Sequence, residues 1–297
     1  MARAQDSHKV QRRAIARGLM HALMILVCIA CAVPLLLIVS ASLTDERALV
    51  ENGFQLIPSK FSFYAYQFLL ADSGRILRAY GISIFVTCVG ASLSLLLMSL
   101  LGYALSRKDF PLRRLISFFV FFPLLFNAGL VPFYILMSRT LHLKDNLLAL
   151  ILPPLVLPFF TLLLRTYFST LPRDLIEAAK LDGASEWRIF FQIVVPLSTP
   201  ALATVGLFSL LFYWNDFYLS LLFINNPRYY NLQYLLYKII SDLQVLENSF
   251  MQSGTKPPLE SVRMAMAVLA MGPVLFAFLF VQKYFVRGIT VGSLKGD

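Results

Sequence analysis

The chain has 297 residues, of which 58% are hydrophobic and 14% charged, and its mean hydropathy is +0.72. Ordinary soluble domains carry roughly 25% charged residues, so this composition argues against a water-soluble fold. The net charge of +10 comes from Lys and Arg residues that lie mainly at the ends of apolar runs. That placement indicates determinants of membrane topology and predicts no nucleic-acid partner.

The first apolar run covers residues 19–43 and follows a short charged segment, residues 1–18. It is too long for the core of a signal peptide, and no clear small-residue cleavage site follows it. The run is therefore predicted to be a retained first membrane span, preceded by an N-terminal segment on the cytoplasmic side.

Five further runs are long enough to cross a membrane, since about 20 apolar residues in a helix span a hydrocarbon core of about 30 Å. The six predicted spans are residues 19–43, 79–102, 115–136, 146–168, 199–222 and 264–286. Their uninterrupted apolar character excludes the alternating pattern of a β-barrel. The sequence thus predicts an all-α membrane protein with about six transmembrane helices and a single transmembrane domain over residues 19–287.

The distribution of Lys and Arg between alternate loops predicts the orientation. With the N-terminus inside, the inner segments hold 16 of the 26 Lys and Arg residues. The outer loops, near residues 44–78 and 223–263, are longer and hold fewer. Both termini are therefore predicted to be cytoplasmic, and residues 288–297 form a cytoplasmic tail.

The prolines within the spans have a structural interpretation. Proline can kink a membrane helix and so suit a bundle that opens around a pathway, although proline is common in membrane helices anyway. The prolines concerned are Pro34, Pro123, Pro132, Pro153, Pro154, Pro158 and Pro273.

The cysteines Cys28, Cys31 and Cys88 are predicted to be packing residues inside the membrane, and the scattered His8, His21 and His142 predict no metal site.

The inner loop over residues 171–196 is predicted to form two short helices. Pro172 suits a first helical turn, and Gly183 can end that helix in a left-handed conformation. Ser185 can then cap a second helix, which runs until Pro196. The loop should therefore be a compact pair of helices on the cytoplasmic face.

Small residues beside a charge give this pair a possible docking role. Ala178 and Ala179 allow close approach of a partner, and the adjacent Glu177 carboxylate can meet a cation. The alternative is an ordinary amphipathic loop at the membrane interface.

The same loop resembles the signature of bacterial ABC importer permeases. That signature has Glu-Ala-Ala, three residues, Gly, nine residues, Ile, one residue and Leu-Pro, and here the matching positions are Glu177, Ala178, Ala179, Gly183, Ile193 and Pro196. Val195 stands where the signature has Leu, a mild apolar change. Residues 181–185 and 196–204 resemble the carbohydrate-uptake branch, including the maltose-type permeases.

Further segments resemble permeases for complex or acidic oligosaccharides such as aldouronate and alginate. They are residues 126–132, 164–168 and 282–296, and the likeness extends from about residue 75 to the end of the chain. This resemblance implies a type I ABC importer permease fold and a sugar or oligosaccharide as cargo, with acidic oligosaccharides such as alginate as the finer expectation.

The resemblance also implies partners and roles. A second homologous permease would form a heterodimer with this chain in the bacterial cytoplasmic membrane, surrounded by lipid. Two cytoplasmic ATPase subunits would bind ATP and Mg, and an extracytoplasmic binding protein would deliver sugar. The residues implied to contact an ATPase are Glu177, Ala178, Ala179, Asp182, Gly183 and Ala184, and the C-terminal tail can also reach the ATPases.

The chain itself is predicted to be no enzyme and to bind no cofactor directly. It lacks the Gly-x-x-x-x-Gly-Lys-Ser/Thr loop whose backbone donors cradle nucleotide phosphates.

Polar and aromatic residues within the spans are candidates for the sugar pathway. Tyr213, Trp214, Asn215 and Asp216 lie together, and a carboxylate at membrane depth is a functional hypothesis by default. The alternative places Asp216 at the interface, with Tyr213 and Trp214 in the aromatic belt.

Asn127 is a further pathway candidate, with a competing role as an interhelical hydrogen-bond partner. Cations for an acidic substrate, or for contact with the binding protein, are Arg228, Lys238, Lys256 and Arg263.

Two other classes of protein remain as alternatives. An ion-driven secondary transporter would show internal repeats and several buried acids, and only Asp216 comes close. A membrane-embedded enzyme would need paired carboxylates or a His/Cys metal constellation, and none is apparent in the sequence.

Overall fold

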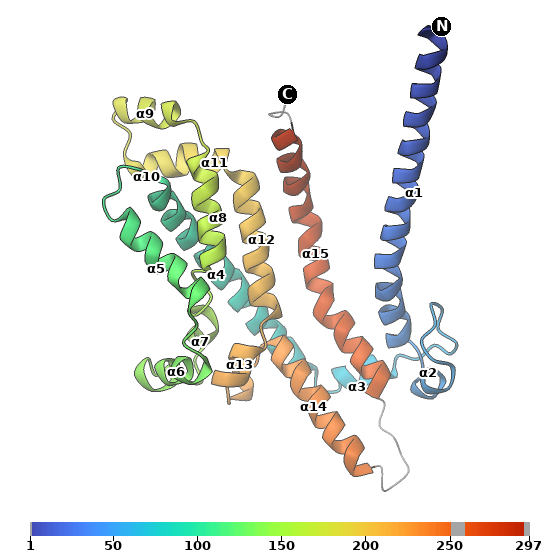
Figure 1. The fold of residues 1–297 in the computed structure, drawn as a ribbon. Coiled ribbons are helices and arrows are strands. Elements are labelled where there is room, and N and C mark those ends of the chain that lie inside the picture. The colour runs from blue at the N-terminus through green and yellow to red at the C-terminus, as the bar shows by residue number, and fades with distance from the viewer. Residues whose placement is uncertain (1, 251–258, 294–297) are drawn as a thin grey trace. The chain divides into compact units, whose positions relative to one another are not determined.

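The computed structural model describes residues 2–250 and 259–293, and Lys256 lies outside these ranges. The regular elements in the described ranges are helices, joined by turns and loops (Figure 1). One isolated antiparallel bridge connects Thr44 and Phe61 there. The predicted all-α class is confirmed.

Eighteen helical elements follow one another along the described chain. They are α1 (Ala2–Ser42), α2 (Glu46–Asn52), α3 (Tyr64–Leu70), α4 (Ser73–Ser106), α5 (Arg113–Leu125), α6 (Leu130–Ile135), η1 (Leu136–Thr140), α7 (Leu148–Ile151), α8 (Pro158–Ser169), α9 (Arg173–Leu181), α10 (Glu186–Ile189), η2 (Phe190–Val194), α11 (Val195–Leu197), α12 (Thr199–Asn215), α13 (Tyr218–Phe223), η3 (Pro227–Tyr229), α14 (Leu232–Phe250) and α15 (Leu259–Ser293).

The chain divides into two compact units, the first of which comprises Met1–Ala71 with Ile240–Leu269. Within this unit Glu46 of α2 meets the start of α15, where its carboxylate accepts hydrogen bonds from the backbone N–H groups of Glu260 (3.0 Å) and Ser261 (2.8 Å). A carboxylate there satisfies free N–H groups and complements the positive end of the helix. This contact ties the segment after α1 to the beginning of the last long helix.

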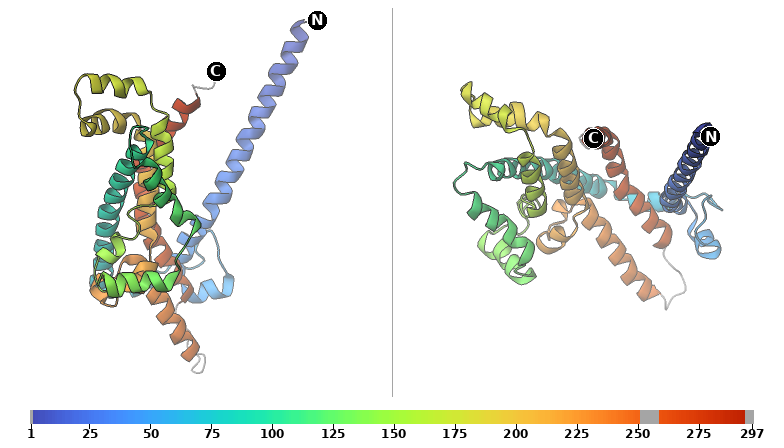
Figure 2. Two further views of the ribbon diagram at one scale, coloured as in Figure 1. Left: turned by 60° about the vertical axis from the view of Figure 1, so that its left-hand side comes forward. Right: turned by 45° about the horizontal axis from the view of Figure 1, so that its top comes forward.

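The second unit, Asp72–Ile239 with Ala270–Asp297, has its core around α4. This helix packs along α8 and α12, and the three lie side by side in every view (Figure 2). Gly102 makes the close approach possible, because a Cβ atom at that position would lie 3.1 Å from Leu164 Cβ and 3.2 Å from the backbone nitrogen of Arg165. Small residues at helix contacts are typical of membrane helices, which gain little from burying apolar surface against one another.

Two of the predicted spans lie within long, unbroken helices that meet the length and hydropathy of a membrane span. These are the stretches Arg17–Ser42 of α1 and Ser73–Ser106 of α4. Two bent helix pairs in the described ranges, α5 with α6–η1 and α10–α11 with α12, bring the possible number to four. The predicted span 264–286 lies inside α15.

The segments predicted as the spans 115–136, 146–168 and 199–222 are not single continuous helices in the structure. The first of these breaks after Leu125, with an angle of 118° between α5 and the helix that begins at Leu130. Between α7 and α8 the chain leaves the helix at residues 152–157, where two consecutive prolines, Pro153 and Pro154, cannot both keep helical hydrogen bonds. The run 199–222 is divided at Asp216, between α12 and α13.

The three cysteines, predicted to be packing residues inside the membrane, lie on the surface of the isolated chain. Cys28, Cys31 and Cys88 are free and exposed on their helices. A surface exposed on the isolated chain is available to lipid or to another subunit, so these residues belong to the outer faces of α1 and α4.

Candidate functional site

The loop over residues 171–196 forms a helix pair that projects from one end of the second unit (Figure 1). Its first helix, α9, begins directly after Pro172 and ends at Leu181, beyond which Gly183 has φ = +78°. The Ser185 hydroxyl then accepts a hydrogen bond from the backbone N–H of Arg188 at 3.3 Å and so caps α10. Both predicted helices are thus confirmed, as are the roles of Gly183 and Ser185 at the end of the first and the start of the second. The second helix runs through η2 and α11 to Leu197.

One face of α9 is anchored in the core of the second unit. Ile176 is buried in a cluster with Phe168, Ile189 and Phe190, while Ala179 and Ala184 pack partly buried against it. The small side chains let the helix lie close to the core, in the way that small residues permit close backbone approach elsewhere.

The other face of α9 presents apolar side chains that nothing in the described chain covers. Leu181 is 89% exposed and Leu175 is 48% exposed. Glu177 and Ala178 are exposed beside them, and Glu177 takes part in none of the ion pairs formed between described residues. The exposed Asp174 and Asp182 likewise enter no ion pair between described residues. An apolar surface with unpaired carboxylates is suited to a protein partner that carries cations.

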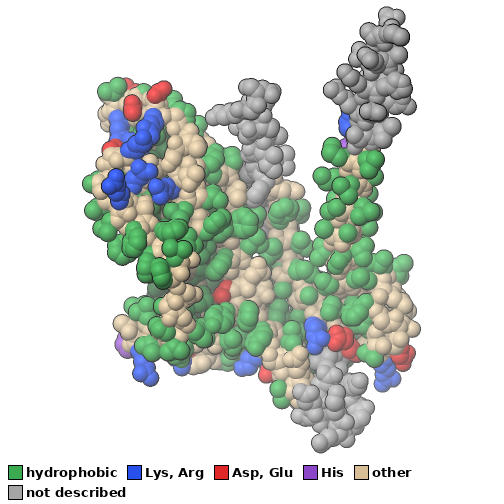
Figure 3. Space-filling view, viewed as in Figure 1, with side chains coloured by type: hydrophobic (Ala, Val, Ile, Leu, Met, Phe, Trp, Pro, Cys, Tyr) green, Lys and Arg blue, Asp and Glu red, His purple; other side chains and the backbone are tan. Residues whose placement is uncertain are grey.

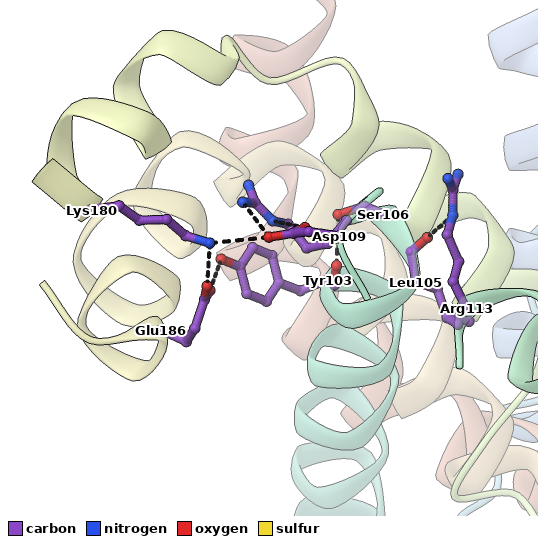
Figure 4. Close-up of polar contacts among 8 residues, drawn as sticks. Tyr103, Leu105, Ser106, Asp109, Arg113, Lys180 and Glu186 are labelled. Atoms are coloured by element: carbon purple, nitrogen blue, oxygen red, sulfur yellow. Dashed lines mark hydrogen bonds and ion pairs between the residues drawn. The ribbon is translucent and has the colours of Figure 1, made fainter. Parts of the chain in front are cut away.

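A polar network joins the helix pair to the end of α4 (Figure 4). The Lys180 ammonium lies 2.6 Å from Glu186 Oε1 and 3.2 Å from Asp109 Oδ2. Glu186 accepts a further hydrogen bond of 2.7 Å through Oε2 from the hydroxyl of Tyr103. Asp109, in the α4–α5 loop, also lies 3.3 Å from Nε of Arg107. Movement of α9 or α10 is therefore resisted by bonds to α4.

The network keeps Lys180, Glu186 and Asp109 charged over a wide pH range. The hydrogen bond to Glu186, outweighing partial desolvation, raises the pKa of Lys180 above its ordinary value. Burial alone would raise the pKa values of Glu186 and Asp109, but hydrogen bonds from Lys180, together with those from Tyr103 and Arg107 respectively, hold both below their ordinary values. These groups act as fixed charges, so they can hold a geometry but would not exchange protons near neutral pH.

Asp182, Gly183 and Ala184, three of the residues predicted to contact an ATPase, form the turn that follows α9. The backbone N–H of Asp182 donates to Ala178 O at 3.0 Å, and that of Ala184 donates to Ala179 O at 2.9 Å. Gly183 between them takes the left-handed conformation that closes such a turn. Sequence reasoning missed the residues that hold this turn to α4, Tyr103, Asp109, Lys180 and Glu186, because their partners are far apart along the chain.

The pathway candidates divide into packing residues and residues that line a hollow. The Tyr213 hydroxyl donates to Ile151 O at 2.8 Å, and the Trp214 indole N–H donates to Ala270 O at 3.0 Å, and both side chains are buried. These two aromatic residues therefore serve as contacts between helices and are not free to stack on a ligand.

Asn215 and Asp216 line a hollow of about 470 Å³ whose other walls are mainly aromatic. Those walls are formed by Phe160, Phe208, Leu211, Phe212, Phe217 and Tyr218. Asp216 also has a structural role, because its Oδ1 accepts a hydrogen bond of 3.3 Å from the backbone N–H of Leu219 in the first turn of α13. Aromatic faces beside hydrogen-bonding groups are the chemistry that a sugar requires.

Asn127 was predicted to lie within a membrane span, but in the structure it lies in the break between α5 and α6. Its Oδ1 accepts a hydrogen bond of 2.8 Å from the backbone N–H of Gly129, which has φ = +84°. The side chain thus stabilises the turn that redirects the chain at this break. It is not among the residues that line the aromatic hollow.

The described residues contain no group of three His, Cys, Asp or Glu side chains that could hold a metal ion. The second unit combines long apolar helices that have small residues at their contacts with an amphipathic helix pair at one end. Together they define a membrane-embedded subunit with a surface for a protein partner.

Comparisons with known proteins specify this class. The family described as "Binding-protein-dependent transport system inner membrane component" matches residues 94–291. The chain is 36% identical to the polygalacturonan/rhamnogalacturonan transport system permease protein YtcP of Bacillus subtilis, over 94% of this chain and 97% of that protein. It is 31% identical to the arabinooligosaccharides transport system permease protein AraQ of Halalkalibacterium halodurans, over 89% of this chain and 91% of that protein.

A solved structure gives the same result. A chain of a bacterial ABC transporter involved in the import of the acidic polysaccharide alginate matches with a TM-score of 0.77 and 30% identity, over 90% of this chain and 96% of that one. The protein belongs to the family of binding-protein-dependent transport system inner membrane components. The family predicted from the loop around Glu177 is thereby confirmed, and the chain is a multi-pass permease of the inner membrane and not an enzyme. It works with a binding protein and with an ATPase.

Proposed function

We propose that this chain forms half of the translocation pathway of an ATP-driven importer for oligosaccharides. The observation that carries the proposal is the exposed face of α9, where Leu181 and Glu177 lie uncovered on a helix held firmly from behind. Relatives named for the transport of polygalacturonan/rhamnogalacturonan, of arabinooligosaccharides and of alginate support the class of cargo. The energy would arrive through this helix from a cytoplasmic ATPase.

The docking role assigns four of the six predicted coupling residues to one exposed surface, while Ala179 and Ala184 pack against the core behind it. Glu177 would face a cation on the ATPase, while Ala178, Asp182 and Gly183 lie exposed around it. Closure of two ATPase subunits on ATP and Mg would displace α9, and the network of Lys180, Glu186 and Asp109 would pass that displacement to α4. The C-terminal tail, of which residues 294–297 lie outside the described ranges, is a second contact in this proposal.

The distribution of charge supports the proposed orientation. Lys and Arg side chains gather at the end of the second unit that carries α9 and α10 (Figure 3). Because basic residues are retained on the cytoplasmic side, this end would face the cytoplasm, with both termini on the same side. A second, homologous permease would complete the pathway, and the binding protein would dock on the opposite side.

The finer proposal for the cargo is an acidic oligosaccharide such as a fragment of alginate. The hollow with Asn215 and Asp216 offers aromatic faces and hydrogen-bonding groups for the sugar rings. Of the cations considered for acidic groups, Arg263 is paired with Glu260 at 2.9 Å, and Lys238 lies 5.3 Å from the ring centre of Tyr230. Arg228 is the cation best placed for a carboxylate, since it enters no ion pair between described residues.

Reconstitution tests the proposal. The chain, its second permease, the ATPase and the sugar-loaded binding protein are placed in vesicles, and uptake is measured with Glu177→Ala and with the control Glu51→Ala, an exposed glutamate of α2. We expect Glu177→Ala to abolish uptake and binding-protein-stimulated ATP hydrolysis while insertion is normal. Stimulated hydrolysis equal to that of the control would refute the docking role, and uptake that survives an inactive ATPase would indicate an ion-driven transporter instead.

A further inference from the structure

A hollow of about 710 Å³ near the start of α5 is lined by four cationic side chains. Its walls are formed by Lys108, Phe110, Pro111, Arg113, Arg114, Ser117 and Arg165. The cations come from the α4–α5 loop, the first turn of α5 and the middle of α8. No acidic residue lines the hollow, and the ion pairs between described residues include none of these four cations.

The neighbouring acid does not neutralise the cluster. Asp109 lies next to Lys108 in the chain, but its two oxygens are taken by Lys180 and Arg107. Among the described residues, Arg113 donates a hydrogen bond from its Nε to the backbone oxygen of Leu105 at 2.9 Å. That bond fixes the guanidinium at the wall of the hollow and supplies no negative charge.

The start of α5 adds to the positive potential. A helix N-terminus carries a partial positive charge and normally attracts acidic side chains, yet the first turn of α5 holds Arg113 and Arg114 and no acid. Ser117, one turn further, has a buried hydroxyl without a hydrogen-bond partner among the described residues. Four cations, a helix N-terminus and an unpartnered hydroxyl around one hollow are the groups that bind a phosphate.

The surface that continues from the hollow is apolar. Along α5, beyond the cations, the side chains of Leu115, Phe118, Phe119 and Phe122 are exposed, Phe119 to 62%. A ligand that bridges both regions needs an anionic head and a long hydrocarbon body. An anionic phospholipid has this chemistry, whereas a soluble phosphate would leave the aromatic side chains uncovered.

We propose that this hollow binds the phosphate headgroup of an anionic phospholipid, whose acyl chains lie along α5. The lipid neutralises the cluster formed by Lys108, Arg113, Arg114 and Arg165, and Ser117 donates to a phosphate oxygen. Because Lys108 precedes Asp109, the bound headgroup also steadies the loop that holds Lys180. The inference rests on the membrane location and on the contents of the hollow, and it does not depend on the identity of the transported sugar.

The test measures lipid bound to the assembled transporter, purified in mild detergent, by native mass spectrometry. Phosphatidylglycerol is the anionic probe, phosphatidylcholine the zwitterionic one and inorganic phosphate the soluble one. The triple variant Lys108→Gln, Arg114→Gln, Arg165→Gln spares Arg113 and its structural bond. The matched control Arg139→Gln, Lys144→Gln, Arg228→Gln removes the same charge from positions outside the hollow.

We expect preferential retention of phosphatidylglycerol, weakened in the triple variant but not in the control. Each basic residue near an anionic headgroup contributes about fivefold, so three give roughly a hundredfold. The single variant Arg114→Gln should show about fivefold, which keeps the test decisive if the triple variant assembles poorly. Equal retention in the triple variant and control would overturn the proposal, as would displacement of the lipid by millimolar inorganic phosphate.

A third outcome would also overturn the proposal. If the triple variant loses its partner permease while lipid retention is unchanged, the cluster binds acidic residues of that subunit. The readout needs no sugar and no ATP, so a failure of the proposed import function would leave this result standing, and the reverse also holds.

Discussion

The ammonium of Lys180 on α9 lies 2.6 Å from Oε1 of Glu186 on α10, so the two helices of the exposed pair are joined by an ion pair at their base. The same carboxylate accepts from Tyr103 at the end of α4. Glu186 is therefore the point at which the helix pair is attached to the longest helix of the second unit. A displacement of α9 by a partner must either break these bonds or move α4.

Replacing Glu186 by Gln should uncouple the displacement of α9 from the movement of α4. The amide keeps its size but loses the charge that holds Lys180 and Tyr103, so we expect binding-protein-stimulated ATP hydrolysis to rise or fall independently of sugar uptake, with uptake reduced several-fold. Stability should change by less than about 1 kcal/mol, because the pair is half exposed to solvent. The ratio of sugar transported to ATP hydrolysed is the measurement, and an unchanged ratio would refute the attachment role.

The network should also give a flat stability profile around neutral pH. The pKa of Glu186 and Asp109 lies below the ordinary value, so their stabilisation is present above the unfolded pKa of about 4 and is lost as the pH falls through the folded one. The pKa of Lys180 is raised, so its stabilisation is present below about pH 10 and is lost as the pH rises through the folded value.

The check for this pH dependence is the difference in melting temperature between the natural chain and Glu186→Gln, measured in the assembled transporter. The difference should be constant between about pH 5 and pH 10 and shrink outside that window. A difference that changes between pH 6 and pH 8 would show that another titrating group controls the helix pair.

Gly183 offers a test of how strictly the end of α9 must be built. Its φ of +78° is strained for any residue with a side chain, while the space around it is open. Gly183→Ala should therefore cost about 1 kcal/mol through the backbone alone, and Gly183→Asn, which tolerates this conformation better, should cost less. If both variants dock and couple normally, the turn is dispensable for the partner surface.

The local parts of this site could be predicted from the sequence, and its long-range parts could not. The end of α9 and the start of α10 follow from Gly183 and Ser185, which act on their immediate neighbours. Tyr103 and Glu186 are 83 residues apart, and Lys180 and Asp109 are 71 apart. Nothing in a sequence pattern specifies which distant charges will meet when three helices pack.

The breaks in the predicted spans have a similar explanation. Hydropathy averaged over a window identifies how much apolar surface a segment has, but it does not show in which direction the chain runs. Pro123, Pro153 and Pro154 signalled a possible change of direction, and the structure has breaks just after the first and at the other two. A proline alone does not require a break, because α1 continues through Pro34 and α15 continues through Pro273.

The close contact between α4 and α8 predicts a large effect from a small substitution. Gly102→Ala places a methyl group about 3.1 Å from Leu164 Cβ and 3.2 Å from the Arg165 backbone, so the helices must separate at a cost of about 1–3 kcal/mol. Gly81→Ala on the same helix meets nothing within 4 Å and should be neutral or slightly stabilising. Thermal unfolding of the two variants in detergent gives the comparison, and equal melting temperatures would contradict this packing.

Asp216 combines a structural role with a place in the aromatic hollow, and two variants separate them. Asp216→Asn keeps an oxygen that can accept from the N–H of Leu219 but removes the charge, whereas Asp216→Ala removes both. If Asp216 serves only to begin α13, the Asn variant should transport normally and the Ala variant should lose about 1 kcal/mol of stability. If the carboxylate contacts sugar in the pathway, both variants should lose transport, the Asn variant without loss of stability.

We expect the second pattern, because Asn215 and several aromatic side chains share the hollow with Asp216, and a helix cap alone gives no reason for a carboxylate in preference to an amide. Uptake rates and melting temperatures measured on the same preparations distinguish the two patterns. Normal uptake by Asp216→Asn would remove this residue from the pathway and leave it as the acceptor for the Leu219 N–H at the start of α13.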